Sequence, residues 1–238
     1  MSSLKTMLNK LVSTDDNHAT AMKKAGLSLA LFAFISVLLV ALTDKLTANK
    51  IAENQEKMLL KALNEIAPKD SYDNNLIASK VIINKTDAKL TSIMNNTPVY
   101  LATKKQLPAT AIFEVTTNQG YSGAITLLVG ISASLKTITG VRVVKHKETP
   151  GLGDKMEIAK TPKNKSPWVY DFNAKSLDNP ATSLWKVKKD GGDFDQFTGA
   201  TITPRAIVNA VKTTLLYAQD NMDVLFTEHQ QSIQAGLK

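Results

Sequence analysis

An uncharged apolar segment near the N-terminus limits the folds open to this chain more than any other feature. From Ala25 to Thr43, nineteen residues carry no charge and are rich in Leu, Ala, Phe, Val and Ile. As an α-helix the segment would extend about 28 Å, at about 1.5 Å per residue, close to the roughly 30 Å of a bilayer's hydrocarbon core. The sequence therefore predicts a single transmembrane helix over residues 25–43.

A cleaved signal peptide and a buried core helix are the alternatives for this segment. A signal peptide has a shorter apolar core and a small-residue cleavage site, and neither is evident before Asp44. Lysines flank the segment on both sides, so the positive-inside rule favours a cytoplasmic N-terminus only weakly. They are Lys5, Lys10, Lys23 and Lys24 before it, and Lys45, Lys50, Lys57 and Lys61 after it. Residues 1–24 form a polar N-terminal extension of unassigned role.

Residues 44–68 are predicted to form a further helical segment. Apolar side chains recur on one stripe between Leu46 and Ala67, and Pro68 follows at the end. The stripe comprises Ile51, Met58, Leu59, Ala62, Leu63 and Ile66. The helix is either a stalk that lifts the rest of the chain off the bilayer or docks on a neighbour, or a helix packed into its own domain.

The remaining residues, 69–238, have the pattern of one α+β domain. Short connections between the predicted strands favour antiparallel pairing. The predicted strands are 109–117, 121–132, 137–146, 168–172 and 185–187, and helical spacing is found at 154–160 and from Pro204 to about Asp220. The apolar face of this last helix is predicted to comprise Ile207, Val208, Val211 and Leu215. We therefore expect an antiparallel sheet with flanking helices.

The segment before the last predicted helix has the features of an anion site. Gly199 and Ala200 leave the backbone uncrowded, so N–H groups can converge there. Thr203 is predicted as the N-cap and Pro204 as the first helical residue. The free N–H groups and positive dipole end of the helix would then face Thr201 and stabilise an anion attached to it. An ordinary capped helix after a glycine-containing loop would give the same pattern.

A second loop, Glu148-Thr149-Pro150-Gly151-Leu152-Gly153, follows the third predicted strand. Pro150 stiffens the loop, whereas Gly151 and Gly153 admit positive φ and let the main chain approach a flat ligand. Leu152 offers an apolar contact to a ring face. The backbone N–H groups of residues 151–153 and 198–200 are candidate ligand contacts.

The two loops together resemble those of a known domain family. The pattern Asp-x-x-Thr-Gly-Ala-Thr at 195–201 resembles the flavinylation motif of bacterial FMN-binding domains. The loop at 148–153 is identical to the Glu-Thr-Pro-Gly-Leu-Gly loop of such domains in RnfG and NqrC type subunits. From the apolar segment to the last helix, the order of elements resembles that of RnfG (RsxG), the G subunit of Rnf (Rsx) ion-translocating electron transport complexes.

This resemblance implies a covalently bound cofactor. FMN would be joined through its phosphate to Thr201, and Asp195 would belong to the motif read by a separate flavin transferase. Other cofactor contacts are expected from Thr198, Gly199 and Ala200 in one loop, and from Glu148, Thr149, Gly151, Leu152 and Gly153 in the other. The flavin loops are thus 148–153 and 195–203, within an FMN-binding domain spanning 69–238.

The resemblance also implies a place in the cell and a function. It predicts a single-pass protein of the bacterial inner membrane whose periplasmic domain carries electrons, with the lipid bilayer and other Rnf membrane subunits as partners. No turnover of a substrate of its own is expected. A C subunit of sodium-pumping NADH:quinone oxidoreductase, which has a similar site, and a membrane-tethered binding or assembly module without redox activity are the alternatives.

Composition excludes several other site classes. The chain has no cysteine, which rules out disulfides, thiolate zinc sites, iron–sulfur ligation and cysteine nucleophiles. The formal net charge of +8 is scattered along the sequence and fits a partner surface or an anionic cofactor better than a nucleic-acid groove. Asp190, Asp193 and Asp195 lack the ligand spacing of a calcium loop, so no metal site is predicted.

The remaining candidates have two interpretations each. His146 could donate to a flavin or a proton path, but a solvated strand end is favoured. Trp168, Tyr170 and Trp185 could stack on a ring system, but core packing is favoured for each.

Overall fold

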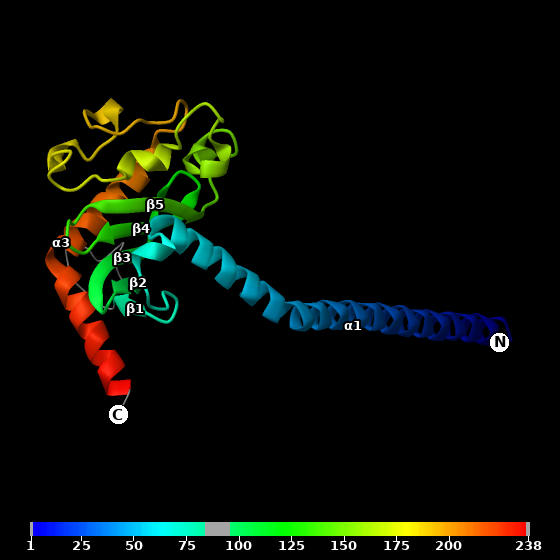
Figure 1. The fold of residues 1–238 in the computed structure, drawn as a ribbon. Coiled ribbons are helices and arrows are strands. Elements are labelled where there is room, and N and C mark those ends of the chain that lie inside the picture. Colours follow the sequence, from blue (N-terminus) through cyan, green and yellow to red (C-terminus); the bar gives the residue numbers. More distant parts are fainter. Residues whose placement is uncertain (1, 84–95, 237–238) are drawn as a thin grey trace. The chain divides into compact units, whose positions relative to one another are not determined.

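The computed structural model describes residues 2–83 and 96–236 (Figure 1). Contacts divide the chain into two units, Met1–Lys57 and Met58–Lys238. Helix α1, Ser2–Ile66, forms the described part of the first unit, and its last turns belong to the second.

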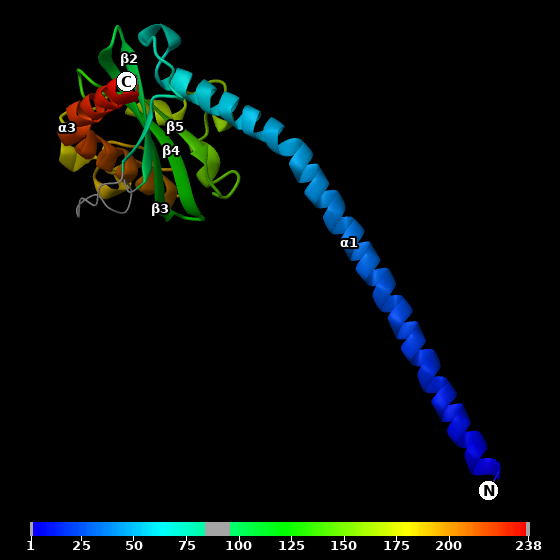
Figure 2. The same cartoon turned by 90° about the horizontal axis from the view of Figure 1, so that it is seen from below.

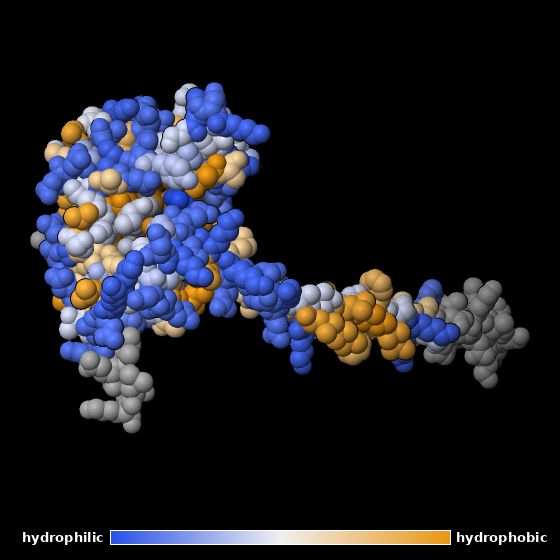
Figure 3. Space-filling model, in the orientation of Figure 1, coloured by the Kyte–Doolittle hydropathy of each residue, from blue (hydrophilic) through white to orange (hydrophobic). Residues whose placement is uncertain are grey.

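The first unit contains the predicted transmembrane segment. Residues 20–66 form a helix that is long and apolar enough to cross a membrane, and its most apolar window is not buried. Large apolar side chains are exposed along it, among them Phe32 at 71 %. In Figure 3 they form an apolar stretch of α1 with hydrophilic residues at both ends. This exposure disagrees with the alternative of a helix buried in the chain's own core.

The second unit is built on a five-stranded antiparallel sheet in which the strands lie in chain order. Its strands are β1 (Lys80–Ile83), β2 (Thr97–Lys104), β3 (Leu107–Gly120), β4 (Gly123–Ser132) and β5 (Ile138–Lys145). The three longest predicted strands correspond to β3, β4 and β5, and the expected α+β fold with an antiparallel sheet is confirmed.

Helix α3, Ile202–Gly236, packs on one face of the sheet. Figure 2 shows its N-terminal half lying along the strands. Four residues predicted to form its apolar face, Ile207, Val208, Val211 and Leu215, are buried against strand residues that include Phe113 and Leu127. The helical spacing of the sequence thus identified the face that covers the sheet.

The other face of the sheet receives the end of α1. Leu63 and Ile66 are buried there with Tyr100 and Leu128. Gly130 and its partner on β5, Gly140, make room for the helix: a Cβ atom on Gly130 would lie 2.1 Å from Cγ2 of Ile66. The end of the predicted 44–68 segment therefore packs into its own domain, whereas Ile51 and Met58 of the same stripe are exposed.

Between β5 and α3 the chain forms short 3₁₀ turns instead of the helix and strands expected there. The turns are η2 (Gly153–Met156), η3 (Ile158–Lys160), η4 (Trp168–Phe172), η5 (Thr182–Leu184) and η6 (Lys188–Asp190); η1 (Lys69–Ser71) follows α1. The expected helix at 154–160 is divided by the extended backbone of Glu157 (φ −75°, ψ 134°).

The two short strands predicted in this region are wrong. Residues 168–172 form η4, and within 185–187 only Val187 makes an isolated bridge, to Phe194. Their aromatic residues have high strand propensity, but here they pack on one another: Phe172 stacks on Phe194, with ring centroids 4.7 Å apart. Packing of side chains therefore outweighs local propensity.

Candidate cofactor site

The two loops singled out from the sequence meet around one cavity of about 270 Å³. Strand β5 returns the chain to the N-terminal end of α3, which brings residues 148–153 beside residues 199–202. The cavity is lined by Glu148, Thr149, Leu152 and Gly153 from the first loop, by Gly199, Ala200, Thr201 and Ile202 from the second, and by Tyr121. Most of the predicted contact residues thus share one site.

A buried carboxylate joins the two loops. The Glu148 side chain accepts a hydrogen bond from the hydroxyl of Thr203 at one oxygen and from the backbone N–H of Ser122, at 2.9 Å, at the other. Glu148 is only 5 % exposed and Thr203 is fully buried. Because a buried carboxylate is costly without donors, these bonds fix the β3–β4 turn, the 148–153 loop and α3 relative to one another.

Two glycines make room for this carboxylate. A Cβ atom on Gly153 would lie 2.7 Å from Glu148 Oε2, and one on Gly120 would lie 2.9 Å from Oε1. Gly151 differs, because its φ is +78° and nothing lies within 4 Å of its Cβ position. Of the two loop glycines, Gly151 therefore supplies the expected positive φ, whereas Gly153 is required by close packing.

The start of α3 differs from the prediction. The backbone N–H of Arg205 bonds to the carbonyl of Thr201 at 3.3 Å, so Thr201 holds the N-cap position and the helix begins at Ile202. Thr203, predicted as the N-cap, lies inside the first turn because its hydroxyl is bound to Glu148. Pro204 is consequently third, and the half-buried Thr201 stands at the positive end of the helix dipole.

Most of the loop N–H groups proposed as cofactor contacts are used inside the loops. Leu152 and Gly153 both donate to the carbonyl of Thr149 at 3.1 Å, and Ala200 donates to Phe197 at 3.0 Å. Gly151 donates to the buried Asp154 carboxylate at 2.7 Å. These bonds make the loops rigid, and they leave side chains and the first turn of α3 as the groups that can contact a ligand.

Three predicted residues do not line the cavity. Thr198 and Gly151 are exposed beside it. Asp195 pairs with Lys188, at 2.6 Å, and its carbonyl accepts a hydrogen bond from the indole of Trp168 at 2.9 Å. This arrangement leaves Asp195 at the surface.

The His146 side chain links the 148–153 loop to Glu157. Its Nδ1 accepts a hydrogen bond from the backbone N–H of Glu148 at 3.1 Å, so the neutral ring carries its proton on Nε2 and donates to Glu157, 2.9 Å away. The ring of His146 is largely buried and holds the 148–153 loop in position. The sequence had instead indicated a solvated strand end or a donor to a flavin.

Tyr121 and Ile202 were not predicted as site residues. Tyr121 occupies the turn between β3 and β4 and is 71 % exposed, yet it lines the cavity. Ile202 is also exposed, at 43 %. Tyr121 was predicted as the first residue of the strand 121–132, and a single exposed aromatic residue is not by itself a signal of a site.

The other candidates have structural roles. Trp168 and Trp185 pack in the aromatic cluster with Phe172, as expected. Core packing is wrong for Tyr170, which is exposed and contacts the Arg142 guanidinium 5.0 Å from its ring centroid. The three aspartates weighed as a cation loop are each paired: Asp190 with Arg205, Asp193 with Lys175 and Asp195 with Lys188. Across residues 2–83 and 96–236, no group of three His, Cys, Asp or Glu side chains is placed to hold a metal ion.

The chain is similar to known families over both units. The FMN-binding domain family matches residues 120–216, which include both loops, and the RnfG N-terminal region family matches residues 7–66. The chain is 47 % identical over 206 residues to the G subunit of the ion-translocating oxidoreductase complex of Pseudoalteromonas atlantica, covering 86 % of this chain and 91 % of that one.

Two further relatives carry the same description. The G subunit of Pseudomonas aeruginosa is 46 % identical over 211 residues, which is 88 % of this chain and 94 % of the relative. That of Aliivibrio fischeri is 43 % identical over 208 residues, which is 87 % and 95 % respectively.

Proposed function

The chain belongs to the family of G subunits of ion-translocating oxidoreductase complexes, and we propose that it carries electrons through an FMN attached covalently at Thr201. As a member of this family it is a membrane-anchored flavoprotein subunit with an FMN-binding domain. The observation that carries the finer proposal is that Thr201 and the 148–153 loop line the same cavity.

The residues around the cavity fit a flat anionic cofactor. The Thr201 hydroxyl lies at the N-terminus of a long helix, where a phosphate is stabilised by the helix dipole and the first-turn N–H groups. Leu152 and Tyr121 present exposed apolar surface to a ring face. The open space beside Gly151 lets a ligand approach the main chain.

The chemistry of attachment assigns a simple role to this chain. Thr201 Oγ1 would form a bond to the phosphorus of the FMN half of FAD, the bond from that phosphorus to AMP would break, and the hydroxyl proton would be released. A separate flavin transferase would catalyse this metal-assisted step. The chain itself supplies the acceptor hydroxyl, the surface motif with Asp195, and a helix terminus that stabilises the phosphate charge.

Once bound, FMN supplies the redox chemistry through its isoalloxazine ring, and the protein holds it in position. Covalent attachment would keep the cofactor present on the periplasmic side of the inner membrane, away from free flavin pools. Other membrane subunits of the complex would donate and accept the electrons. The names of the relatives favour this assignment over a C subunit of sodium-pumping NADH:quinone oxidoreductase.

Fluorescence of the protein in a denaturing gel tests the attachment. Flavin fluorescence is expected in the wild type coexpressed with a flavin transferase, absent in Thr201→Ala and retained in Thr201→Ser, which keeps a hydroxyl. Thr227→Ala is the matched control, because this exposed threonine lies on α3 outside both flavin loops and outside the cavity lining. Fluorescence that survives in Thr201→Ala would place the bond elsewhere.

An intact mass equal to that of the unmodified chain, after maturation with the transferase, would favour a different function. The chain would then be a membrane-tethered binding or assembly module that holds a free anion or no ligand at Thr201. Peptide mapping of protein purified from its native membrane would make the same distinction.

A further inference from the structure

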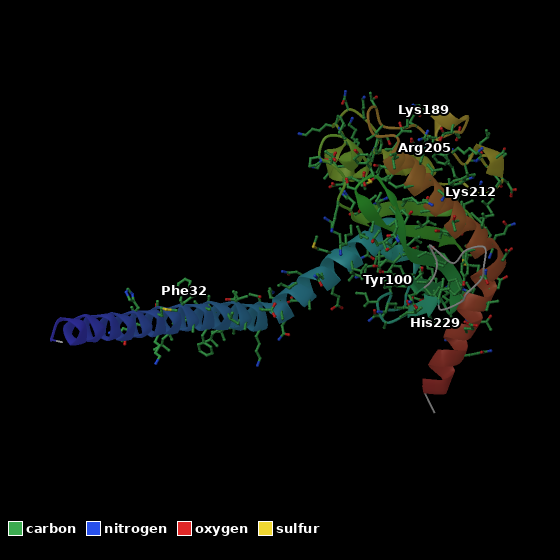
Figure 4. All side chains as sticks on the ribbon, turned by 180° about the vertical axis from the view of Figure 1, so that it is seen from behind. Phe32, Tyr100, Lys189, Arg205, Lys212 and His229 are labelled. Atoms are coloured by element: carbon green, nitrogen blue, oxygen red, sulfur yellow. The ribbon has the colours of Figure 1, made fainter. Side chains whose placement is uncertain are left out.

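A second cavity, of about 410 Å³, lies beside the first turns of α3 and shares Ile202 with the cofactor cavity. We call it the basic groove. Its charged lining residues are Lys186, Arg205 and Lys212, together with one acid, Asp190. Viewed from behind, Arg205 and Lys212 follow one another along α3, with Lys189 near the start of the helix (Figure 4).

The groove carries an excess of uncompensated positive charge. Arg205 binds Asp190 through two hydrogen bonds, at 2.6 and 2.7 Å, so these two charges largely offset each other. Neither Lys186 nor Lys212 forms an ion pair with any acidic side chain among the residues that the structure describes. The positive charge around Asp190 lowers the pKa of its carboxyl group. Arg205 has the largest effect, and the charges of Lys189 and Lys186 add to it.

The walls of the groove are preformed. Trp185 and Val187 are buried beneath it, and the Trp185 indole N–H bonds to the carbonyl of Ser176 at 3.0 Å. At its other side Asn209 donates to Gln119 at 3.0 Å, which links α3 to the end of β3. A partner could therefore dock without reorganising this surface, which limits the entropic cost of binding.

We propose that the basic groove is the docking site for a carboxylate-bearing segment of a partner subunit, with Lys186 and Lys212 as its ion-pairing residues. The groove combines an apolar floor with separate cations at an exposed rim, which suits a polypeptide carrying both apolar and acidic side chains.

The position of the groove gives docking a consequence, and this step rests on the proposed function. Because Ile202 borders both cavities and follows Thr201 directly, a segment seated in the groove lies next to the attached cofactor. Docking there would bring a redox partner to the flavin. Charge complementarity would also accelerate the encounter at low ionic strength.

Site-directed photo-crosslinking in native membranes tests the docking site without relying on the flavin. A benzophenone amino acid replaces the exposed Lys189, which lies between the lining residues Val187 and Asp190, so that the bond between Asn209 and Gln119 stays intact. The adduct is identified by mass spectrometry. We expect a cross-link to an Asp- or Glu-containing segment of another subunit of the complex. The yield of this cross-link should fall about tenfold in Lys186→Glu/Lys212→Glu, which reverses both charges. It should fall by a smaller factor in Lys186→Gln/Lys212→Gln, which only removes them.

Lys163→Glu/Lys165→Glu is the matched control, since it makes the same charge change at two exposed lysines outside the groove. This control should leave the cross-link unchanged. The proposal is overturned by adducts to lipid alone, by the absence of any adduct to another subunit, or by a yield that both charge reversals reduce equally. It is also overturned if phosphate abolishes the cross-link while chloride of equal ionic strength does not, because the groove would then bind a small anion.

Flavin fluorescence of the same samples separates the two proposals. The groove variants should retain the fluorescent band, because Lys186 and Lys212 lie outside the cofactor cavity. A wild-type chain without flavin that still gives the charge-dependent cross-link would refute the attachment at Thr201 and retain the docking site. A chain that carries the flavin but gives no cross-link would refute the docking site and retain the attachment at Thr201.

Discussion

Thr203 donates its hydroxyl hydrogen to the buried carboxylate of Glu148, 55 residues earlier in the chain. This bond connects the first turn of α3 to the loop after β5. Glu148 lines the same cavity as Thr201, and Thr203 is only two residues from Thr201, so the bond holds together the two halves of the proposed cofactor site.

Removing this donor should destabilise the site. Thr203→Val preserves the shape of the side chain but leaves the Glu148 carboxylate with one donor fewer in a buried position. The expected cost is about 1–3 kcal/mol of the free energy of unfolding, with reduced flavin loading. Denaturant unfolding of the detergent-purified chain, followed by tryptophan fluorescence, measures it.

Thr227→Val is the control, because this threonine lies on the same helix and is exposed. Its free energy of unfolding should change by no more than about 0.5 kcal/mol. Equal losses in the two variants would show that the bond between Thr203 and Glu148 has no special weight.

The longer elements of the fold followed from local sequence signals. Strand-forming residues predicted β3, β4 and β5, and the spacing of Ile207, Val211 and Leu215 predicted the buried face of α3. Both signals are local, since each depends only on the residues of a single element. The packing of Ile66 on Gly130 could not be predicted from local sequence, because it joins residues from distant parts of the chain.

The candidate site was less accessible to the same reasoning. The two loops were identified by resemblance, whereas their meeting depends on β5 and α3 being neighbours in space. Thr203 was taken for an N-cap because its partner, Glu148, is remote in sequence. The N–H groups of residues 151–153 were assigned to a ligand because their bonds to Thr149 and Asp154 exist only in the folded loop.

Gly153 and Gly151 should respond differently to substitution by alanine. In Gly153→Ala the new methyl group would lie 2.7 Å from Glu148 Oε2, which forces the carboxylate from its place. Overpacking of this kind costs about 1–3 kcal/mol. Gly151→Ala meets open space and loses only about 1–2 kcal/mol from its φ of +78°.

Flavin loading separates these two variants more sharply than stability does. In-gel flavin fluorescence, normalised to protein, should fall strongly in Gly153→Ala and remain near the wild-type level in Gly151→Ala. The reverse order would show that the conformation at Gly151, rather than the packing of Glu148, determines loading.

Gly130→Ala should loosen the end of α1 from the sheet. Its methyl group would lie 2.1 Å from Cγ2 of Ile66 and 2.4 Å from the hydroxyl of Thr139. We expect a loss of about 1–3 kcal/mol in the free energy of unfolding. Ile66→Ala alone should cost about 2–5 kcal/mol through the cavity it leaves.

A double-mutant cycle checks that both changes act at one contact. In Gly130→Ala/Ile66→Ala the added methyl group occupies part of the space vacated by the isoleucine, so the combined loss should be smaller than the sum of the single losses. Losses that add without interaction would contradict the proposed fit of Ile66 to Gly130.

Tyr121→Ala should change the surroundings of the flavin ring without preventing attachment of the flavin. The side chain lines the cavity, whereas the proposed attachment uses the hydroxyl of Thr201. We expect the gel fluorescence to be retained, while the absorption maximum of the native protein shifts and free quencher reaches the ring more easily. Tyr121→Phe keeps the aromatic face and should behave as the wild type. An unchanged spectrum in Tyr121→Ala would place the ring elsewhere.

His229 should make the stability of the domain sensitive to acid. The side chain is 7 % exposed on α3, and burial lowers its pKa below the ordinary value of 6.5. The unfolded chain therefore takes up a proton at a higher pH than the folded chain does. The stability associated with neutral His229 is fully present above pH 6.5 and is lost as the pH falls below 6.5 towards the lowered pKa of the folded state.

His229→Gln should remove this part of the pH dependence, because glutamine does not titrate. The free energy of unfolding, measured in denaturant between about pH 8 and about pH 5, should fall less steeply in the variant than in the wild type. His18→Gln, at an exposed position in the first unit, should keep the wild-type slope. If His229→Gln keeps that slope as well, the acid sensitivity comes from other groups, and the burial of His229 does not control it.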